Sequence, residues 1–113
     1  MKLPSNVIIP DDKITQYLLV FREQDDKSKF LAKGGFNQNN SEELKLAIYN
    51  LIKKSEAIED ITNEYGTFYR VEGNLRGVNS QYLSVITIWL KRIIDNRIQF
   101  ITLKPKKEKQ VND

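Results

Sequence analysis

The chain has 113 residues, of which 40% are hydrophobic and 29% are charged, and its formal net charge is +3. This length and balance are typical of one folded domain that buries its own core. Cysteine and histidine are both absent, which excludes thiol nucleophiles, disulfides, Ser-His-Asp triads and zinc sites built from Cys and His. Any catalysis must therefore use carboxylates, lysines, arginines or hydroxyl groups.

The sequence shows no sign of a membrane segment. No apolar run reaches the roughly 18 residues that cross a bilayer, and the first residues lack the apolar core of a signal peptide. Together with the absence of cysteine, this favours a cytoplasmic protein that does not bind membranes.

Carboxylates are adjacent in sequence at Asp11-Asp12, Asp25-Asp26 and Glu59-Asp60. Neighbouring side chains point in different directions on helices and strands, so this spacing does not predict a metal site. We therefore expect neither a metal ion nor another cofactor.

Charge is distributed unevenly along the chain. Residues 1–64 carry 9 basic and 11 acidic side chains, whereas residues 65–113 carry 9 basic and 4 acidic side chains. Four lysines fall within six residues near the end, Lys104, Lys106, Lys107 and Lys109. Such a basic half can attract RNA, although a solvated tail that aids solubility is the alternative. We expect residues 1–105 to form a single domain, with 106–113 as a disordered basic tail.

Helical periodicity dominates the first half. A first helix begins at Pro10-Asp11 and places four side chains on one face, Ile14, Tyr17, Leu18 and Phe21. After a charged turn over residues 22–26, a short second helix is predicted over 27–33, ended by Gly34-Gly35.

The third helix has the clearest pattern. Asn40 and Glu43 have the spacing of a capping box at its start. Its apolar side chains recur at helical spacing and predict a buried stripe: Leu44, Ala47, Ile48, Leu51 and Ile52.

From Thr67 onward the hydrophobic period becomes two. Strands are predicted over residues 67–76, 81–91 and 97–104, joined by short turns that make all three antiparallel. The sequence thus predicts an α+β fold, with N-terminal helices packed on one face of a C-terminal antiparallel β-meander.

Alternation assigns the strand residues to faces. In the central strand we expect one set to face the helices, Tyr82, Ser84, Ile86, Ile88 and Leu90, and the other to face outward, Leu83, Val85, Thr87, Trp89 and Lys91. In the first strand the inward set is Tyr69, Val71 and Leu75, and the outward set is Phe68, Arg70 and Glu72. In the third strand Ile98, Phe100, Thr102 and Lys104 share a face, but the pattern leaves its direction open.

An outward Thr102 set would combine cations, hydroxyls and an aromatic ring on one open face. The residues expected to bind RNA or a protein partner there are Phe68, Trp89, Phe100, Lys104, Lys106 and Lys107. A sheet covered on both sides, or a homodimer interface, is the alternative interpretation.

Several short motifs, in their order and spacing, resemble a known family. They are Lys27 to Leu31, Gly35-Phe36, Glu64-Tyr65-Gly66, Tyr69 with Val71, Gly73 with Gly77, Thr87-Ile88-Trp89, and Thr102 with Pro105. This order resembles an uncharacterised bacterial domain family that occurs alone and at the C-termini of polymorphic toxins. That family is grouped with the barnase, EndoU, colicin-type tRNase and RelE-like nuclease folds.

The resemblance implies metal-independent RNA cleavage with Lys27, Arg70, Thr87 and Thr102 as candidate catalytic residues. Lys27 or Arg70 would hold the phosphate and the threonine hydroxyls would orient it. Toxin-borne relatives carry a histidine ahead of the lysine, whereas residues 20–26 of this chain contain none. Basic side chains and tyrosine would then have to transfer protons.

Each of these residues also has a structural interpretation. Lys27 could pair with a neighbouring Asp25 or Asp26, Arg70 could form a cross-strand ion pair, and Trp89 could anchor the sheet. Two functional hypotheses follow. The first is an RNA-binding domain, with or without cleavage, and the second is a non-catalytic interaction module. The module would bind a small cognate antitoxin-like protein or a second copy of itself.

Overall fold

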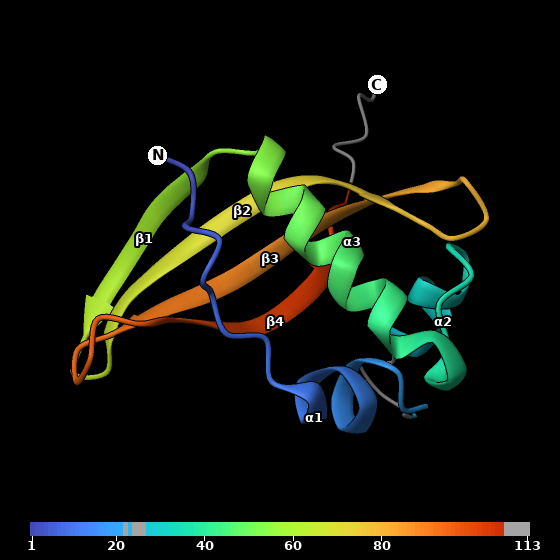
Figure 1. The fold of residues 1–113 in the computed structure, drawn as a ribbon, viewed down its shortest axis with the longest axis horizontal. Coiled ribbons are helices and arrows are strands. Elements are labelled where there is room, and N and C mark those ends of the chain that lie inside the picture. The colour runs from blue at the N-terminus through green and yellow to red at the C-terminus, as the bar shows by residue number, and fades with distance from the viewer. Residues whose placement is uncertain (22, 24–26, 108–113) are drawn as a thin grey trace.

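The computed structural model describes residues 1–21, 23 and 27–107. The helical elements are α1 (Asp11–Lys13), the π-helical turn η1 (Ile14–Leu18), α2 (Lys27–Ala32), the 3-10 turn η2 (Gln38–Asn40) and α3 (Ser41–Lys54). The strands are β1 (Ala57–Asn63), β2 (Gly66–Arg76), β3 (Tyr82–Arg92) and β4 (Ile98–Pro105). Figure 1 shows the helices in the first half of the chain and the sheet in the second, so the predicted α+β fold is confirmed.

The four strands form one antiparallel meander in the order β1-β2-β3-β4. The sequence predicted three of them and missed β1. In that strand only the first residue, Ala57, is buried and the next six are exposed, so it has no alternating apolar signal. None of the helices formed by the described residues is long and apolar enough to span a membrane.

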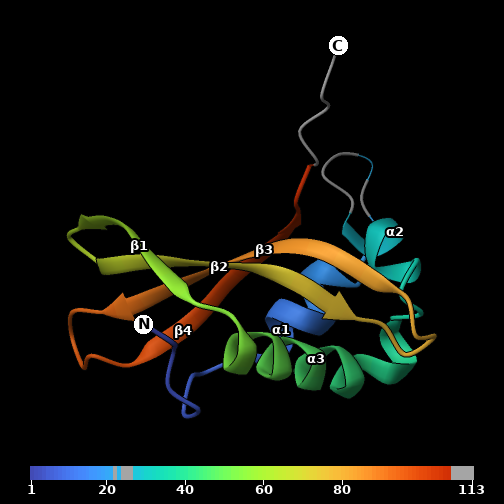
Figure 2. The ribbon, with the colours of Figure 1, turned by 90° about the horizontal axis from the view of Figure 1, so that it is seen from above.

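Helix α3 supplies most of the packing against the sheet. Its predicted stripe is buried as expected: Leu44, Ala47, Ile48, Leu51 and Ile52. Figure 2 shows α3 and α1 on one side of the sheet, whereas α2 lies near one end of the strands, toward the other side. We call the side covered by α3 the helix face and the opposite side the open face.

Two local predictions about the helices were wrong. The first helical segment ends at Leu18, so Phe21 lies beyond it and is exposed instead of joining the buried stripe. The expected cap of Asn40 on α3 is also absent. Its Oδ1 instead accepts from the Asn37 N–H, while the Asn37 side chain accepts from the Asn39 N–H, so capping occurs one turn earlier, around η2.

The faces of β3 are the reverse of the prediction. Four of its residues are buried on the helix face, Leu83, Val85, Thr87 and Trp89, whereas Ile86, Ile88 and Leu90 are half-buried on the open face. The reason is the register with β2: Val71 lies opposite Thr87, and Tyr69 lies opposite Trp89. Cross-strand partners share a face, and the β2 residues had been assigned correctly.

A buried hydrogen-bond relay makes Thr87 compatible with the core. Trp89 Nε1 donates to Thr87 Oγ1 at 2.8 Å, and Thr87 Oγ1 donates to the Val71 carbonyl at 2.9 Å. Trp89 and Thr87 are both fully buried. Every polar atom of the pair is therefore satisfied without water.

An irregularity in β4 splits the set that strict alternation had grouped together. Ile88 lies opposite Thr102 but Trp89 lies opposite Phe100, so Ile101 is an extra residue. Ile98, Phe100 and Leu103 are consequently buried on the helix face. Thr102 and Lys104 lie on the open face instead. The Phe100 ring packs edge-on against Trp89, with centroids 5.3 Å apart.

Removing the hydroxyl at position 87 should destabilise the fold. Thr87→Val keeps the side-chain shape but leaves the Trp89 N–H buried without an acceptor, which costs about 1–3 kcal/mol. Urea unfolding followed by fluorescence of the single tryptophan measures this loss. The matched control is Thr67→Val, because that hydroxyl meets Thr62 Oγ1 at the surface. Equal stability of the two variants would contradict the relay.

An ion pair ties α1 to α3 and should make stability depend on pH. Lys45 Nζ lies 2.6 Å from Asp11 Oδ1, and this hydrogen bond raises the pKa of Lys45, with partial burial opposing it. A raised lysine pKa stabilises the fold below the unfolded-state value of about 10.4, and the gain is lost as pH rises through the folded value.

We therefore expect Asp11→Asn to lower the free energy of unfolding by about 0.5 kcal/mol at pH 7 and by almost nothing at a pH above the raised pKa of Lys45. Denaturant unfolding at both pH values measures the difference. Asp12→Asn removes the same charge from an exposed carboxylate and is the control. A deficit of Asp11→Asn that persists at high pH would rule out the ion pair as its source.

Candidate binding surface on the open face

A lysine and two hydroxyl groups meet at the β4 edge of the open face. Lys27, the first residue of α2, is half-buried, and its Nζ donates to Thr102 Oγ1 at 2.8 Å and to the Tyr17 hydroxyl at 3.0 Å. The same ammonium lies 5.0 Å from the centre of the Tyr17 ring. Three elements, η1, α2 and the sequence-distant β4, thus converge on one cation.

Arg70 lies in the same row of the sheet as this cluster. The register places Arg70 opposite Ile88 and Ile88 opposite Thr102, so Arg70 and Thr102 are two strand spacings apart, about 10 Å. In the next row Ile86 lies between Glu72 and Lys104. The open face therefore has an apolar centre between two polar margins.

One carboxylate bridges two of the cations. Glu72 Oε2 lies 2.8 Å from Arg70 Nε, and Glu72 Oε1 lies 3.0 Å from Lys106 Nζ. The Arg70 Nε–H does not point along the line to the oxygen, so the contact is an ion pair without a well-aligned hydrogen bond. Because Arg70 and Lys106 share the single negative charge of Glu72, this group of three side chains is net positive. Arg70 does pair with an acidic neighbour, but that neighbour lies on its own strand.

The structure places three of the four candidate catalytic residues on the same face, but only Lys27 and Thr102 are in contact. Lys27, Arg70 and Thr102 share the open face. Thr87 does not, because it is buried on the helix face with its hydroxyl committed to the relay. A direct contact of Thr87 with a substrate on the open face is therefore ruled out. The alternative partners proposed for Lys27, Asp25 and Asp26, lie outside the described residues.

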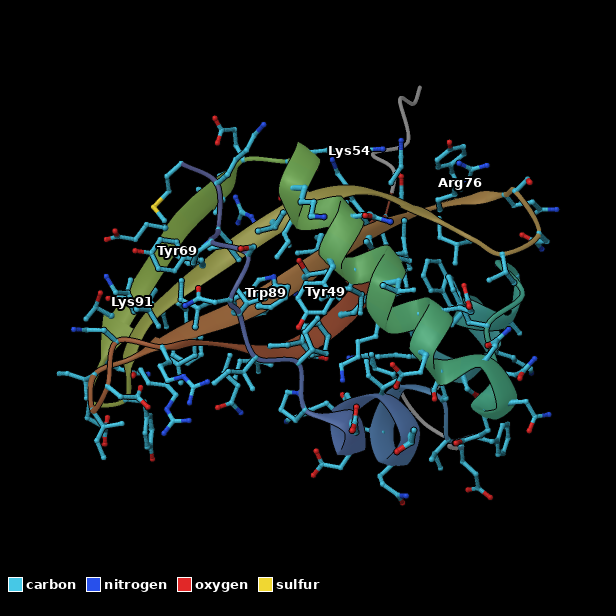
Figure 3. The ribbon with its side chains drawn as sticks, viewed as in Figure 1. Tyr49, Lys54, Tyr69, Arg76, Trp89 and Lys91 are labelled. Carbon is cyan, nitrogen blue, oxygen red and sulfur yellow. The ribbon has the colours of Figure 1, made fainter. Side chains whose placement is uncertain are left out.

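The candidate binding residues divide in the same way. Phe68 is half-buried on the open face, and Lys104, Lys106 and Lys107 are exposed. Trp89 and Phe100 are fully buried on the helix face, so neither can stack on a base. In Figure 3 Trp89 lies over the strands, beside α3 and the N-terminal segment, and its full burial agrees with the interpretation of Trp89 as a sheet anchor. Lys109 belongs to residues 108–113, which lie outside the described part of the chain.

Tyr17 is the residue of this cluster that sequence reasoning missed. Its helical spacing placed it in the apolar stripe of the first helix, and it does pack against the core while remaining half-buried. The one available signal was that it carried the only hydroxyl in that stripe. Over residues 1–21, 23 and 27–107, no three acidic side chains come close enough to hold a metal ion.

The fold and the sequence can be placed among known proteins. The structure is similar to a chain from a contact-dependent growth inhibition toxin–immunity protein complex of Klebsiella pneumoniae 342, with a TM-score of 0.69 and 18% identity. The match covers 92% of this chain and 97% of that chain, and at this identity it shows a shared fold.

No curated protein matches the sequence. Residues 2–107 match a family described as a domain of unknown function, DUF6883. This match spans nearly the whole chain and includes every element of the sheet and every helix described above. The chain therefore belongs to the DUF6883 family.

Proposed function

We propose that the open face binds single-stranded RNA and that the chain is the RNA-directed member of a toxin–immunity-type pair. The observation that carries this proposal is the position of Lys27, held between the hydroxyls of Tyr17 and Thr102 in one row with Arg70. Ammonium and guanidinium groups on an uncovered face are the contacts that phosphate oxygens prefer.

The charge of this face supports a polyanionic ligand. Among the residues that the structure describes, the Lys27 ammonium has two neutral hydroxyls as hydrogen-bond partners and no carboxylate. Lys104 and Lys107 add exposed cations nearby, and Glu72 offsets one charge only. RNA phosphates would replace released counterions around these groups.

Cleavage would use the same groups. The 2′-hydroxyl oxygen of the RNA would attack the adjacent phosphorus, and the bond from phosphorus to the 5′-oxygen would break, giving a cyclic phosphate. Lys27 and Arg70 would stabilise the charge that develops on the phosphate oxygens. The Tyr17 hydroxyl would donate its proton to the departing 5′-oxygen, while the 2′-hydroxyl proton would pass to water, from which Tyr17 would be reprotonated. Thr102 would orient Lys27, whereas Thr87 has no part in this scheme.

Titration with labelled single-stranded RNA at several salt concentrations tests the binding. Each phosphate contact contributes about −0.7 to the slope of log K against log salt, so Lys27→Met and Arg70→Gln should each flatten the slope by about that amount. Lys91→Gln is the matched control, because Lys91 is exposed at the other end of β3, as Figure 3 shows. Equal slopes for all three variants, or no binding at low salt, would reject the proposal.

Removing the bridging carboxylate should strengthen binding. In Glu72→Gln both Arg70 and Lys106 lose their ionic partner, so we expect tighter RNA binding and a steeper salt dependence than in the wild type. Glu64→Gln removes an equal charge from the exposed β1–β2 turn and is the control. An equal gain in both variants would point to net charge instead of this margin.

A second function, a non-catalytic protein-interaction module, is favoured by the apolar centre of the open face. Ile86, Ile88, Leu90 and Phe68 are only half-buried there, and a protein partner could cover them. This hypothesis predicts no RNA binding at moderate salt, together with loss of partner binding in Ile88→Asp. RNA cleavage assays with and without a chelator, using protein free of any partner, separate it from the ribonuclease hypothesis.

A further inference from the structure

A groove along the free edge of the sheet lies outside the proposed RNA site. It has a volume of about 640 Å³ and lies between α3 and the end of the β2–β3 hairpin. Its helical wall includes Leu46, Asn50 and Lys54, and its strand wall includes Arg76, Val78 and Tyr82. Three of these side chains are large, apolar and exposed: Leu46 (57%), Val78 (48%) and Tyr82 (62%).

The strand wall of the groove is an unpaired edge of the sheet. β1 accompanies β2 only as far as Val71, so the rest of that edge has no neighbouring strand. The Gly77 N–H donates to the Gln81 carbonyl across the hairpin, and alternation then directs the backbone groups of Asn74 and Arg76 away from β3. No backbone hydrogen bond within the described chain reaches these groups. Such an edge can accept a further strand.

The charges beside the groove favour an acidic occupant. Lys54 on α3 and Arg76 on β2 are exposed, and neither has an ion-pair partner among the described residues. Figure 3 shows both along the upper margin of the molecule, one at the end of α3 and one at the end of β2. Glu43 is the one carboxylate in the lining, at the far end of α3.

We propose that this groove binds an extended acidic segment of a partner protein, which adds to the free edge of β2 as a strand. The helical wall from Glu43 to Lys54 is about 16 Å long, which an extended segment of about five residues would cover. Alternate side chains of the segment would contact Leu46 and Val78, and its carboxylates would pair with the two cations. A second copy of the chain docking through the same edge would bring Arg76 toward its own counterpart, which disfavours a homodimer there.

Selection from a phage library of random eight-residue peptides tests the proposal without a known partner. The full chain should enrich peptides in which acidic and apolar residues alternate. The best peptide, synthesised and labelled, should bind Arg76→Glu at least tenfold more weakly than the wild type. Binding to Arg97→Glu should not change, because Arg97 is exposed in the β3–β4 turn, away from the groove.

Amide hydrogen exchange supplies a readout of where the peptide binds. We expect the bound peptide to slow exchange at Asn74 and Arg76, as a new strand on β2 requires. Failure to enrich peptides, enrichment of basic peptides, or protection of other strands would each overturn the inference. So would competition between single-stranded RNA and the peptide, or a dimer that Arg76→Glu dissociates. Loss of RNA binding in Lys27→Met would leave this result unchanged, so the two proposals fail independently.

Discussion

Helix α3 crosses the sheet over Gly73, and this contact decides which surfaces remain for other molecules. A Cβ atom at position 73 would lie 2.6 Å from Leu51 Cδ1 and 2.8 Å from Ser55 Oγ, so with any larger residue these two side chains would have to shift while the helix keeps this close approach to β2. The buried stripe of α3 then fills the helix face, and the N-terminal segment closes the edge of β4, where Ile8 pairs with residues 98 and 100. Because α3 covers only one face of the sheet, the opposite face stays open.

Where the hydrophobic periodicity of the sequence is regular, it predicted the helix or strand correctly. The α3 stripe and the three long strands appear where expected, because each buries one regular face. β1 escaped detection because only Ala57 of its seven residues enters the core. The faces of β3 were reversed because Thr87 looks polar in the sequence. The Thr87 hydroxyl is satisfied by hydrogen bonds that can be inferred only when the register with β2 is known.

The candidate site was predictable in part, and not from periodicity. Lys27 and Thr102 are 75 positions apart and came together only through the family resemblance, yet their side chains are in direct contact. The alternation of residues along β2 predicted that Arg70 faces outward, and this prediction was correct. Tyr17 could not be separated from core residues by its spacing, and the sharing of Glu72 by Arg70 and Lys106 depends on the path of the chain after β4.

The extra residue in β4 determines which side chains of this strand reach the open face. Because Ile101 stands outside the pairing, the chain changes parity there, and Thr102 and Leu103 take opposite faces from those that strict alternation would give. One inserted position thus lets a polar residue reach the exterior while the interior keeps Phe100 and Leu103. All residues after the insertion could change their pairing register with β3 together, while the packing of the residues before it would be preserved. The length of the strand, as well as its composition, therefore encodes which chemistry faces outward.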